Sequence, residues 1–212
     1  ANSGTIYLTF DDGPGAYTTQ ILDILDKYNI KATFFVTNNG SDEVLKEEYD
    51  RGHTIGLHTA THQWSIYNSV SSYFDDLNSV QARVERVTGK RSSYIRFPGG
   101  SSNTISRSRS KGIMTTLTGK VQEEGYKYFD WNVCVEDAGD CAKRNVSDRE
   151  ACVYNYFTGY LSKNRVNVVL LHDIKSYTAN ALERMIKYGL EQGYTFKAIN
   201  DDTPMIHQRV NN

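Results

Sequence analysis

A regular alternation of strand-like and helix-like segments runs along the chain, and this pattern most limits its possible folds. Short runs rich in β-branched and aromatic residues alternate with segments whose apolar residues recur every three or four positions. Residues 166–171 (VNVVLL) are almost continuously apolar, as expected of a strand buried on both faces. The alternation predicts a parallel sheet with right-handed crossovers.

The predicted strands cover residues 5–10, 31–37, 54–57, 94–97, 126–133, 166–171 and 194–199. The predicted helices cover residues 18–28, 43–51, 70–88, 113–124, 148–164 and 179–192, with Ser147 or Asp148 as a candidate N-cap. An open doubly wound sheet and a barrel both fit this order. Both folds place their active sites at the carboxyl ends of the strands.

Length and charge narrow the functional classes. The 212 residues suit a single domain, so we expect one catalytic unit over residues 1–212. The net charge of -1 argues against nucleic-acid binding, which needs a basic face. No apolar run is long enough for a membrane span. We expect a monomer whose partner is its substrate, with no nucleic acid and no membrane span in this chain.

Three cysteines, Cys134, Cys141 and Cys152, lie close together in the sequence. A disulfide between Cys134 and Cys141 fits an exported protein, and three free thiols fit equally well. The absence of a CxxC pair argues against a cysteine metal site.

Ionisable residues fall where predicted strands end. The first strand leads into Asp11-Asp12-Gly13-Pro14, which suits either metal binding and water activation or a solvated turn. His58 and His62 are four apart in HTATH, so one helical turn would place both on the same side of a metal site. The earlier His53 is interpreted as structural.

Three further strands end in a similar way. Arg96 closes its strand before Pro98-Gly99-Gly100 and needs a carboxylate partner if it is buried. Asp130 lies in FDWN, inside an apolar segment. A charged carboxylate in such a segment needs a cationic or histidine partner. His172 directly follows the most hydrophobic strand. Each residue alone is more often structural than catalytic, but five strand ends of this kind together indicate a hydrolytic site.

The motifs TFDDGP, HTATH, RFPGG, FDWN and LLHD, taken in this order, resemble the polysaccharide deacetylase family (NodB-homology domain, carbohydrate esterase family 4). The resemblance runs from Thr9 to Asp173 and implies a distorted (β/α) barrel with about seven parallel strands.

The resemblance also implies roles for individual residues. Asp11 matches the general base and Arg96 the arginine that pairs with it. Asp12, His58 and His62 match the metal ligands, with Zn expected and Co or Mn as alternatives. His172 matches the general acid, and Asp130 the carboxylate that orients it. Trp131 and Leu170 match the apolar walls of the acetyl pocket, and the Gly99 N–H matches an oxyanion donor.

One departure concerns the substrate groove. Many family members have tyrosine where this chain has Gly99. Glycine keeps the N–H but lacks the aromatic side chain, so the resemblance does not determine the shape of the groove. The resemblance implies N-deacetylation of a GlcNAc-containing polysaccharide such as peptidoglycan or chitin. The alternatives are O-deacetylation of acetylated xylan and a non-catalytic glycan-binding protein. Such substrates lie outside the cytoplasm, so we expect an extracellular or cell-surface protein.

Overall fold

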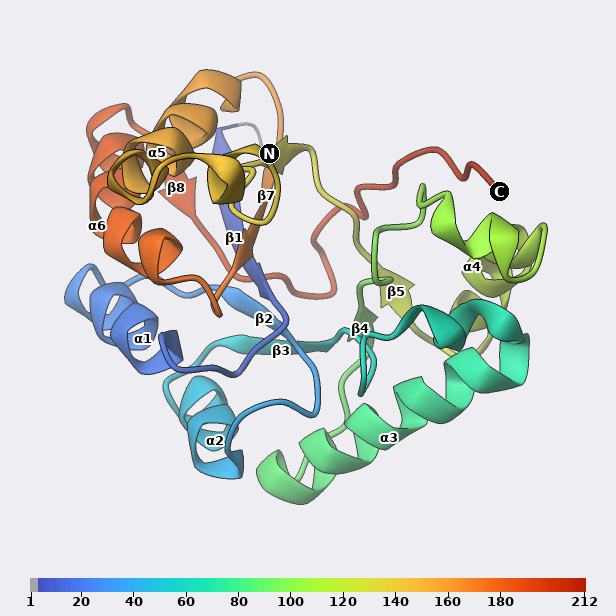
Figure 1. Ribbon diagram of the computed structural model, residues 1–212. Helices are drawn as coiled ribbons and strands as arrows, with labels where there is room; N and C mark the ends of the chain where they lie inside the picture. Colours follow the sequence, from blue (N-terminus) through green and yellow to red (C-terminus); the bar gives the residue numbers. More distant parts are fainter. Residues whose placement is uncertain (1–3) are drawn as a thin grey trace.

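The computed structural model describes residues 4–212, and the strands in this range form one parallel sheet that curls into an incomplete barrel (Figure 1). The sheet order is β5-β4-β3-β2-β1-β7-β6, and β8 pairs with the start of β1. The strands are β1 (Thr5–Asp11), β2 (Thr33–Val36), β3 (Thr54–Leu57), β4 (Tyr94–Ile95), β5 (Lys127–Tyr128), β6 (Val133–Cys134), β7 (Asn167–His172) and β8 (Thr195–Phe196). The predicted distorted barrel is confirmed.

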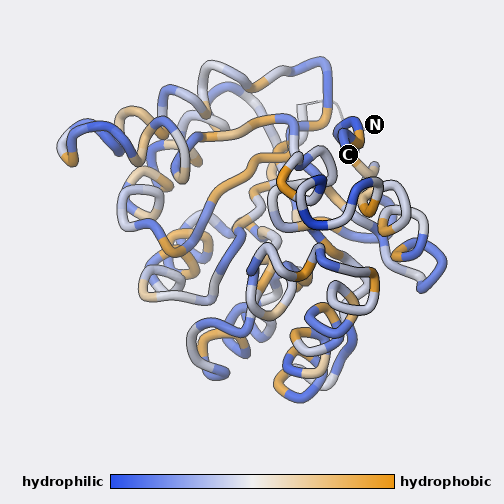
Figure 2. The backbone as a smooth tube through the Cα atoms, turned by 45° about the vertical axis from the view of Figure 1, so that its right-hand side comes forward, coloured by the Kyte–Doolittle hydropathy of each residue, from blue (hydrophilic) through white to orange (hydrophobic). Residues whose placement is uncertain are grey.

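Six α-helices surround this sheet: α1 (Thr18–Lys27), α2 (Asp42–Asp50), α3 (Val70–Thr88), α4 (Ile113–Glu123), α5 (Arg149–Tyr160) and α6 (Ser176–Glu191) (Figure 1). Apolar segments coincide with the central strands (Figure 2). Side chains alternate along a strand, so Ile6, Leu8 and Phe10 of β1 pack in the larger core under the helices. Tyr7 packs instead with Phe35 and other residues in a second, smaller core. The same alternation places Asp11 on the face of the sheet that Tyr7 occupies.

The predicted strand 126–133 is wrong in one respect, because it divides into β5 and β6, which lie at opposite edges of the sheet. The residues between them leave the ladder. Asp130 N–H donates to the Ile206 carbonyl at 2.7 Å, and Asn132 exchanges hydrogen bonds with the backbone around Val168. Among the described residues β5 and β6 do not pair, so the barrel stays open between them.

The last residues of the chain lie along this opening. After β8 the chain crosses the molecule and ends beside α4 (Figure 1). The Gln208 N–H donates to Asp130 Oδ2 at 2.8 Å, and Asn212 Oδ1 accepts from the Thr115 N–H at 2.8 Å. This extended segment supplies hydrogen-bonding partners where a strand is missing.

Candidate active site

Asp11 and Arg96 form a buried ion pair at the carboxyl end of the sheet. Asp11 is the last residue of β1, and Arg96 follows β4. The Arg96 guanidinium donates to Asp11 Oδ1 at 2.9 Å and to Thr9 Oγ1 at 2.7 Å. It also donates to the carbonyls of Phe129 and Asp130. Four hydrogen bonds therefore surround this fully buried cation, which compensates for its removal from water.

Asp12 lies beside two histidine side chains. Its Oδ1 is 3.4 Å from His58 Nε2 and 3.6 Å from His62 Nε2. The candidate ligand atoms of the three residues all lie within 4.8 Å of one another. Asp12 Oδ1 is buried and has no hydrogen-bond partner among the described residues, which is costly unless a cation completes it. Two imidazole nitrogens and one carboxylate oxygen suit a zinc-type ion, so the residues fit the predicted metal.

His58 is held in the form that binds a metal. Its Nδ1 lies 2.8 Å from the Arg96 carbonyl, so Nδ1 carries the proton and Nε2 presents its lone pair towards Asp12. Burial lowers the pKa of His58 to about 3, so its imidazole is neutral at neutral pH. A neutral imidazole is the protonation state that metal binding requires.

The prediction that a helical turn brings His58 and His62 together is wrong. The strand β3 ends at Leu57, and the chain then forms an irregular loop with positive φ at Thr59 (64°) and His62 (55°). The two rings nevertheless meet, with centroids 4.9 Å apart. Left-handed residues fold the loop back on itself, so the i, i+4 spacing gives proximity without a helix.

The partner of His172 is Asp137, and the prediction of Asp130 is wrong. His172 Nδ1 lies 2.7 Å from Asp137 Oδ1, and the His172 N–H donates to Asp137 Oδ2 at 2.8 Å. Thr178 also donates to this carboxylate. Burial lowers the pKa of His172, but the adjacent charge of Asp137 outweighs it and raises the pKa to about 9. The opposite ring nitrogen, Nε2, lies 3.9 Å from Asp12 Oδ2.

Asp130 instead anchors the glycine turn that follows Arg96. Its Oδ1 accepts from the Ser101 N–H at 2.8 Å, and its Oδ2 accepts from the Ser101 hydroxyl and the Gln208 N–H. Asp130 is fully buried, so three neutral donors satisfy a carboxylate for which we expected a cation or a histidine.

The predicted pocket residues lie close to these groups. Gly99 has φ +78°, and its N–H has no acceptor among residues 4–212, so it is free to donate to a ligand. Trp131 lies with the Arg96 guanidinium 5.5 Å from its ring. Leu170 is buried in β7, two residues before His172 and therefore on the same face of the strand. Their roles at a substrate stay predictions.

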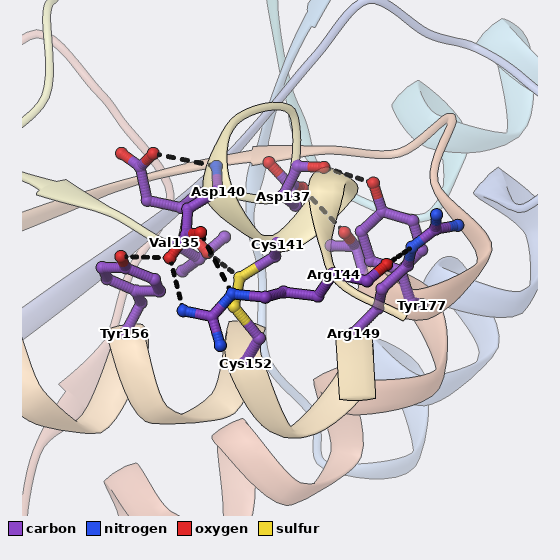
Figure 3. Close-up of a disulfide and its surroundings, with 11 residues drawn as sticks. Val135, Asp137, Asp140, Cys141, Arg144, Arg149, Cys152, Tyr156 and Tyr177 are labelled. Atoms are coloured by element: carbon purple, nitrogen blue, oxygen red, sulfur yellow. Dashed lines mark hydrogen bonds and ion pairs between the residues drawn. A yellow bond between two sulfur atoms is a disulfide. The ribbon is translucent and has the colours of Figure 1, made fainter. Parts of the chain in front are cut away.

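A disulfide fastens the segment that carries Asp137 (Figure 3). It joins Cys141, in a short 3-10 helix (Asp140–Lys143), to Cys152 in α5. Cys134 is free, so neither the predicted Cys134–Cys141 bridge nor three free thiols is correct. Asp137 itself receives a hydrogen bond at its carbonyl from the Tyr177 hydroxyl (Figure 3).

Asp137 is the one residue of this cluster that sequence reasoning missed. It follows β6 in Val135-Glu136-Asp137, but the predicted strand 126–133 placed the suspicious carboxylate inside the strand instead. The sequence signal that could have found it is the acidic pair Glu136-Asp137, shortly after the apolar segment 126–133. Its partner, His172, is 35 residues away, and no local pattern links the two.

Carboxylates and histidines at the carboxyl ends of a curled parallel sheet define an enzyme of the α/β-barrel class. The sequence profile of the family described as polysaccharide deacetylase matches residues 1–116. The chain is 31% identical over 202 residues to the peptidoglycan-N-acetylglucosamine deacetylase of Bacillus cereus. This match covers 93% of this chain and 70% of that protein. The peptidoglycan-N-acetylmuramic acid deacetylase PdaA of Bacillus subtilis is also 31% identical over 202 residues, with the same coverage.

The crystal structure of the catalytic domain of peptidoglycan N-acetylglucosamine deacetylase from Eubacterium rectale superposes with a TM-score of 0.93. Its sequence is 46% identical, and the match covers 99% of this chain and 94% of that one. The chain therefore belongs to the polysaccharide deacetylase family. No helix within residues 4–212 is long and apolar enough to cross a membrane.

Proposed function

We propose that the chain is a metal-dependent hydrolase that removes N-acetyl groups from a GlcNAc-containing polysaccharide, of the peptidoglycan or chitin type, and releases acetate. The observation that carries this proposal is the grouping of Asp12, His58 and His62, with an unsatisfied buried carboxylate oxygen between the two imidazoles. The named activities of the relatives, which act on peptidoglycan, support this class of substrate.

The metal triad lies between Asp11 and His172, which have opposite roles in proton transfer. A bound divalent ion, for which we propose Zn with Co or Mn as alternatives, would acidify a water and polarise the acetyl carbonyl. Asp11 accepts the proton of the attacking water, and the Arg96 guanidinium, which donates to Asp11 Oδ1 at 2.9 Å, holds this carboxylate in position. The unpaired Gly99 N–H donates to the oxyanion that develops on the carbonyl.

His172 acts on the leaving group. An amine leaves poorly unless it is protonated, and His172 has a raised pKa, so it carries a proton at neutral pH. Asp137 holds the Nδ1 side of the ring, which turns Nε2 towards the metal triad. A group prepared to protonate an amine favours amide over ester hydrolysis, and this favours N-deacetylation over the O-deacetylation of xylan.

We also propose that the protein works outside the cytoplasm, at the cell surface or beyond. Its substrates lie there, and a disulfide such as Cys141–Cys152 persists in oxidising surroundings.

The test is acetate release from chitin oligomers, peptidoglycan and acetylxylan, each with and without chelator and after metal is restored. We expect release from one of the two amide substrates, loss on chelation and recovery on metal addition. Acetate from acetylxylan alone would establish the O-deacetylase alternative. A metal-loaded protein that releases acetate from none of the three would contradict catalysis altogether.

A further inference from the structure

We propose that Trp64 is a sugar-binding platform beside the metal triad, and that it contacts the ring next to the sugar whose acetyl group is removed. This inference rests on the proposed function, because it names how the polysaccharide is held at the same site. It assigns a specificity-determining role to a residue outside the motifs that identified the family.

Trp64 lies directly at the candidate metal site. It begins a short 3-10 helix (Trp64–Asn68) two residues after His62, and the centroids of the two rings are 5.4 Å apart. The indole is only partly buried. A large, partly exposed aromatic ring at this distance from a metal ligand is placed to contact whatever molecule the site holds.

The glycine turn after Arg96 is shaped to admit this indole. Gly99 has φ +78°, and a Cβ added there would lie 3.4 Å and 3.5 Å from Cη2 and Cζ3 of Trp64. It would also lie 3.0 Å from the Cβ of Asn103. A side chain at position 99 would therefore press on Asn103 and lie in van der Waals contact with the Trp64 ring. Trp64 thus places an aromatic surface next to Gly99, the position where many family members have a tyrosine.

Gly100 shows the same relation to the second tryptophan. A Cβ there would lie 2.8 Å from Cη2 of Trp131. The two glycines of the turn thus each lie against the six-membered ring of one of the chain's two tryptophans. Only Trp64 is also paired with a candidate metal ligand, and for this reason we assign the platform to it.

The position of Trp64 is fixed before any ligand binds. Tyr67, on the same short helix, is fully buried and donates to the Pro98 carbonyl at 2.6 Å. The rings of Trp64 and Tyr67 stack with centroids 6.4 Å apart. Asn103 donates to the Gly100 carbonyl at 2.8 Å and holds the turn from its other side. A surface held in this way loses little entropy when it binds a ligand.

The chemistry of the indole suits a sugar ring. The apolar C–H face of a hexopyranose packs on an aromatic ring, and its hydroxyl groups accept and donate hydrogen bonds at the edge. Within residues 4–212, Trp64 Nε1 donates no hydrogen bond to the protein. The edge of the ring that carries Cη2 and Cζ3 faces the turn, so the N–H on the other part of the indole remains available to a sugar hydroxyl.

The first experiment separates binding from chemistry in Trp64→Ala. We expect the KM for N-acetylchitopentaose to rise about 10-fold, the effect of losing roughly one good aromatic contact, while kcat changes less than about twofold. Trp64→Phe should restore most of the affinity. Tyr160→Ala is the matched control, because Tyr160 is an aromatic side chain on α5 with 58% exposure.

The alternative is that Trp64 merely supports His62. In that case Trp64→Ala would lower metal content, measured by elemental analysis, and would lower kcat with KM little changed. This result would overturn the platform.

A second measurement does not depend on turnover. Trp131→Phe leaves Trp64 as the only tryptophan, and its fluorescence is titrated with the glucosamine pentamer. A saturable change supports the platform even if no acetate is ever released, which would refute only the proposed function. The absence of any change with the glucosamine pentamer, in a folded variant that still releases acetate from N-acetylchitopentaose, would overturn the platform itself.

Discussion

The two sides of the candidate site are built differently. On the base and metal side, all the groups except His62 lie at or just after the ends of β1, β3 and β4, which belong to one continuous stretch of the sheet, and His62 lies in the loop that follows β3. On the acid side, only His172 lies on a strand, and its partner Asp137 lies in an irregular segment held by a disulfide and by contacts to α6. Groups placed by the sheet follow from local sequence, whereas groups placed by loops depend on contacts distant in the chain.

The largest effect should come from the metal side. Asp12→Ala removes the carboxylate that both imidazoles face, and we expect loss of bound metal and a fall in turnover of about 1,000-fold, from the several kcal/mol that metal polarisation contributes. Elemental analysis and acetate-release kinetics measure the two effects. Asp50→Ala is the control, because Asp50 is exposed on α2 and pairs there with Lys46. Unchanged metal content in Asp12→Ala would refute the triad.

On the acid side, His172→Ala should reduce kcat about 100-fold or more, the usual contribution of general acid–base catalysis. The reduction should be greater for an N-acetyl substrate than for an O-acetyl ester, because an alkoxide leaves more readily than an amine without protonation. Parallel kinetics on a chitin oligomer and on acetylxylan measure the difference. Near-normal turnover of the amide would contradict the general-acid role.

A pair of isosteric variants distinguishes the two carboxylates. Asp137→Asn removes the negative charge that raises the pKa of His172 to about 9, so this pKa should fall. A general acid works while protonated, so activity should be lost as pH rises through about 9 in the parent and at lower pH in the variant. Asp130→Asn should leave the pKa of His172 unchanged, since Asp130 contacts Ser101 and Gln208. Imidazole NMR of the metal-free protein and the pH dependence of kcat measure both. An equal shift in the two variants would contradict the assignment.

These contrasts explain how far the sequence could predict the structure. The parallel barrel follows from alternating periodicity, and the helix predicted at 70–88 has those bounds in the structure, where Gly89 ends it in a left-handed conformation. The approach of Arg96 to Asp11 follows from two polar strand ends on one sheet. The break at residues 129–132 could not be predicted, because it depends on hydrogen bonds to the chain's last residues, more than 70 positions away.

The disulfide tests whether the acid side depends on covalent support. It encloses a separation of 11 residues, so Cys141→Ser with Cys152→Ser should lower the free energy of unfolding by about 3 kcal/mol. The effect on kcat should be small, because Thr178 and Tyr177 still hold Asp137. Denaturant unfolding and kinetics measure the two quantities, with Cys134→Ser as the control. A large loss of kcat in the folded double variant would show that the bridge itself positions Asp137.

The smallest expected effects concern the N-termini of two helices, α3 and α5. The first residue before α3, Ser69, accepts a hydrogen bond from the Ser72 N–H at 3.0 Å. Before α5, Asp148 occupies the predicted N-cap position, but its φ and ψ are helical and its side chain makes no capping hydrogen bond. Ser69→Ala should therefore cost about 1 kcal/mol of stability, and Asp148→Ala only a few tenths through its charge near the helix dipole. Denaturant midpoints of the two variants measure the difference. Equal losses would mean that the Asp148 side chain does cap α5, which would contradict the contrast between the two helix starts.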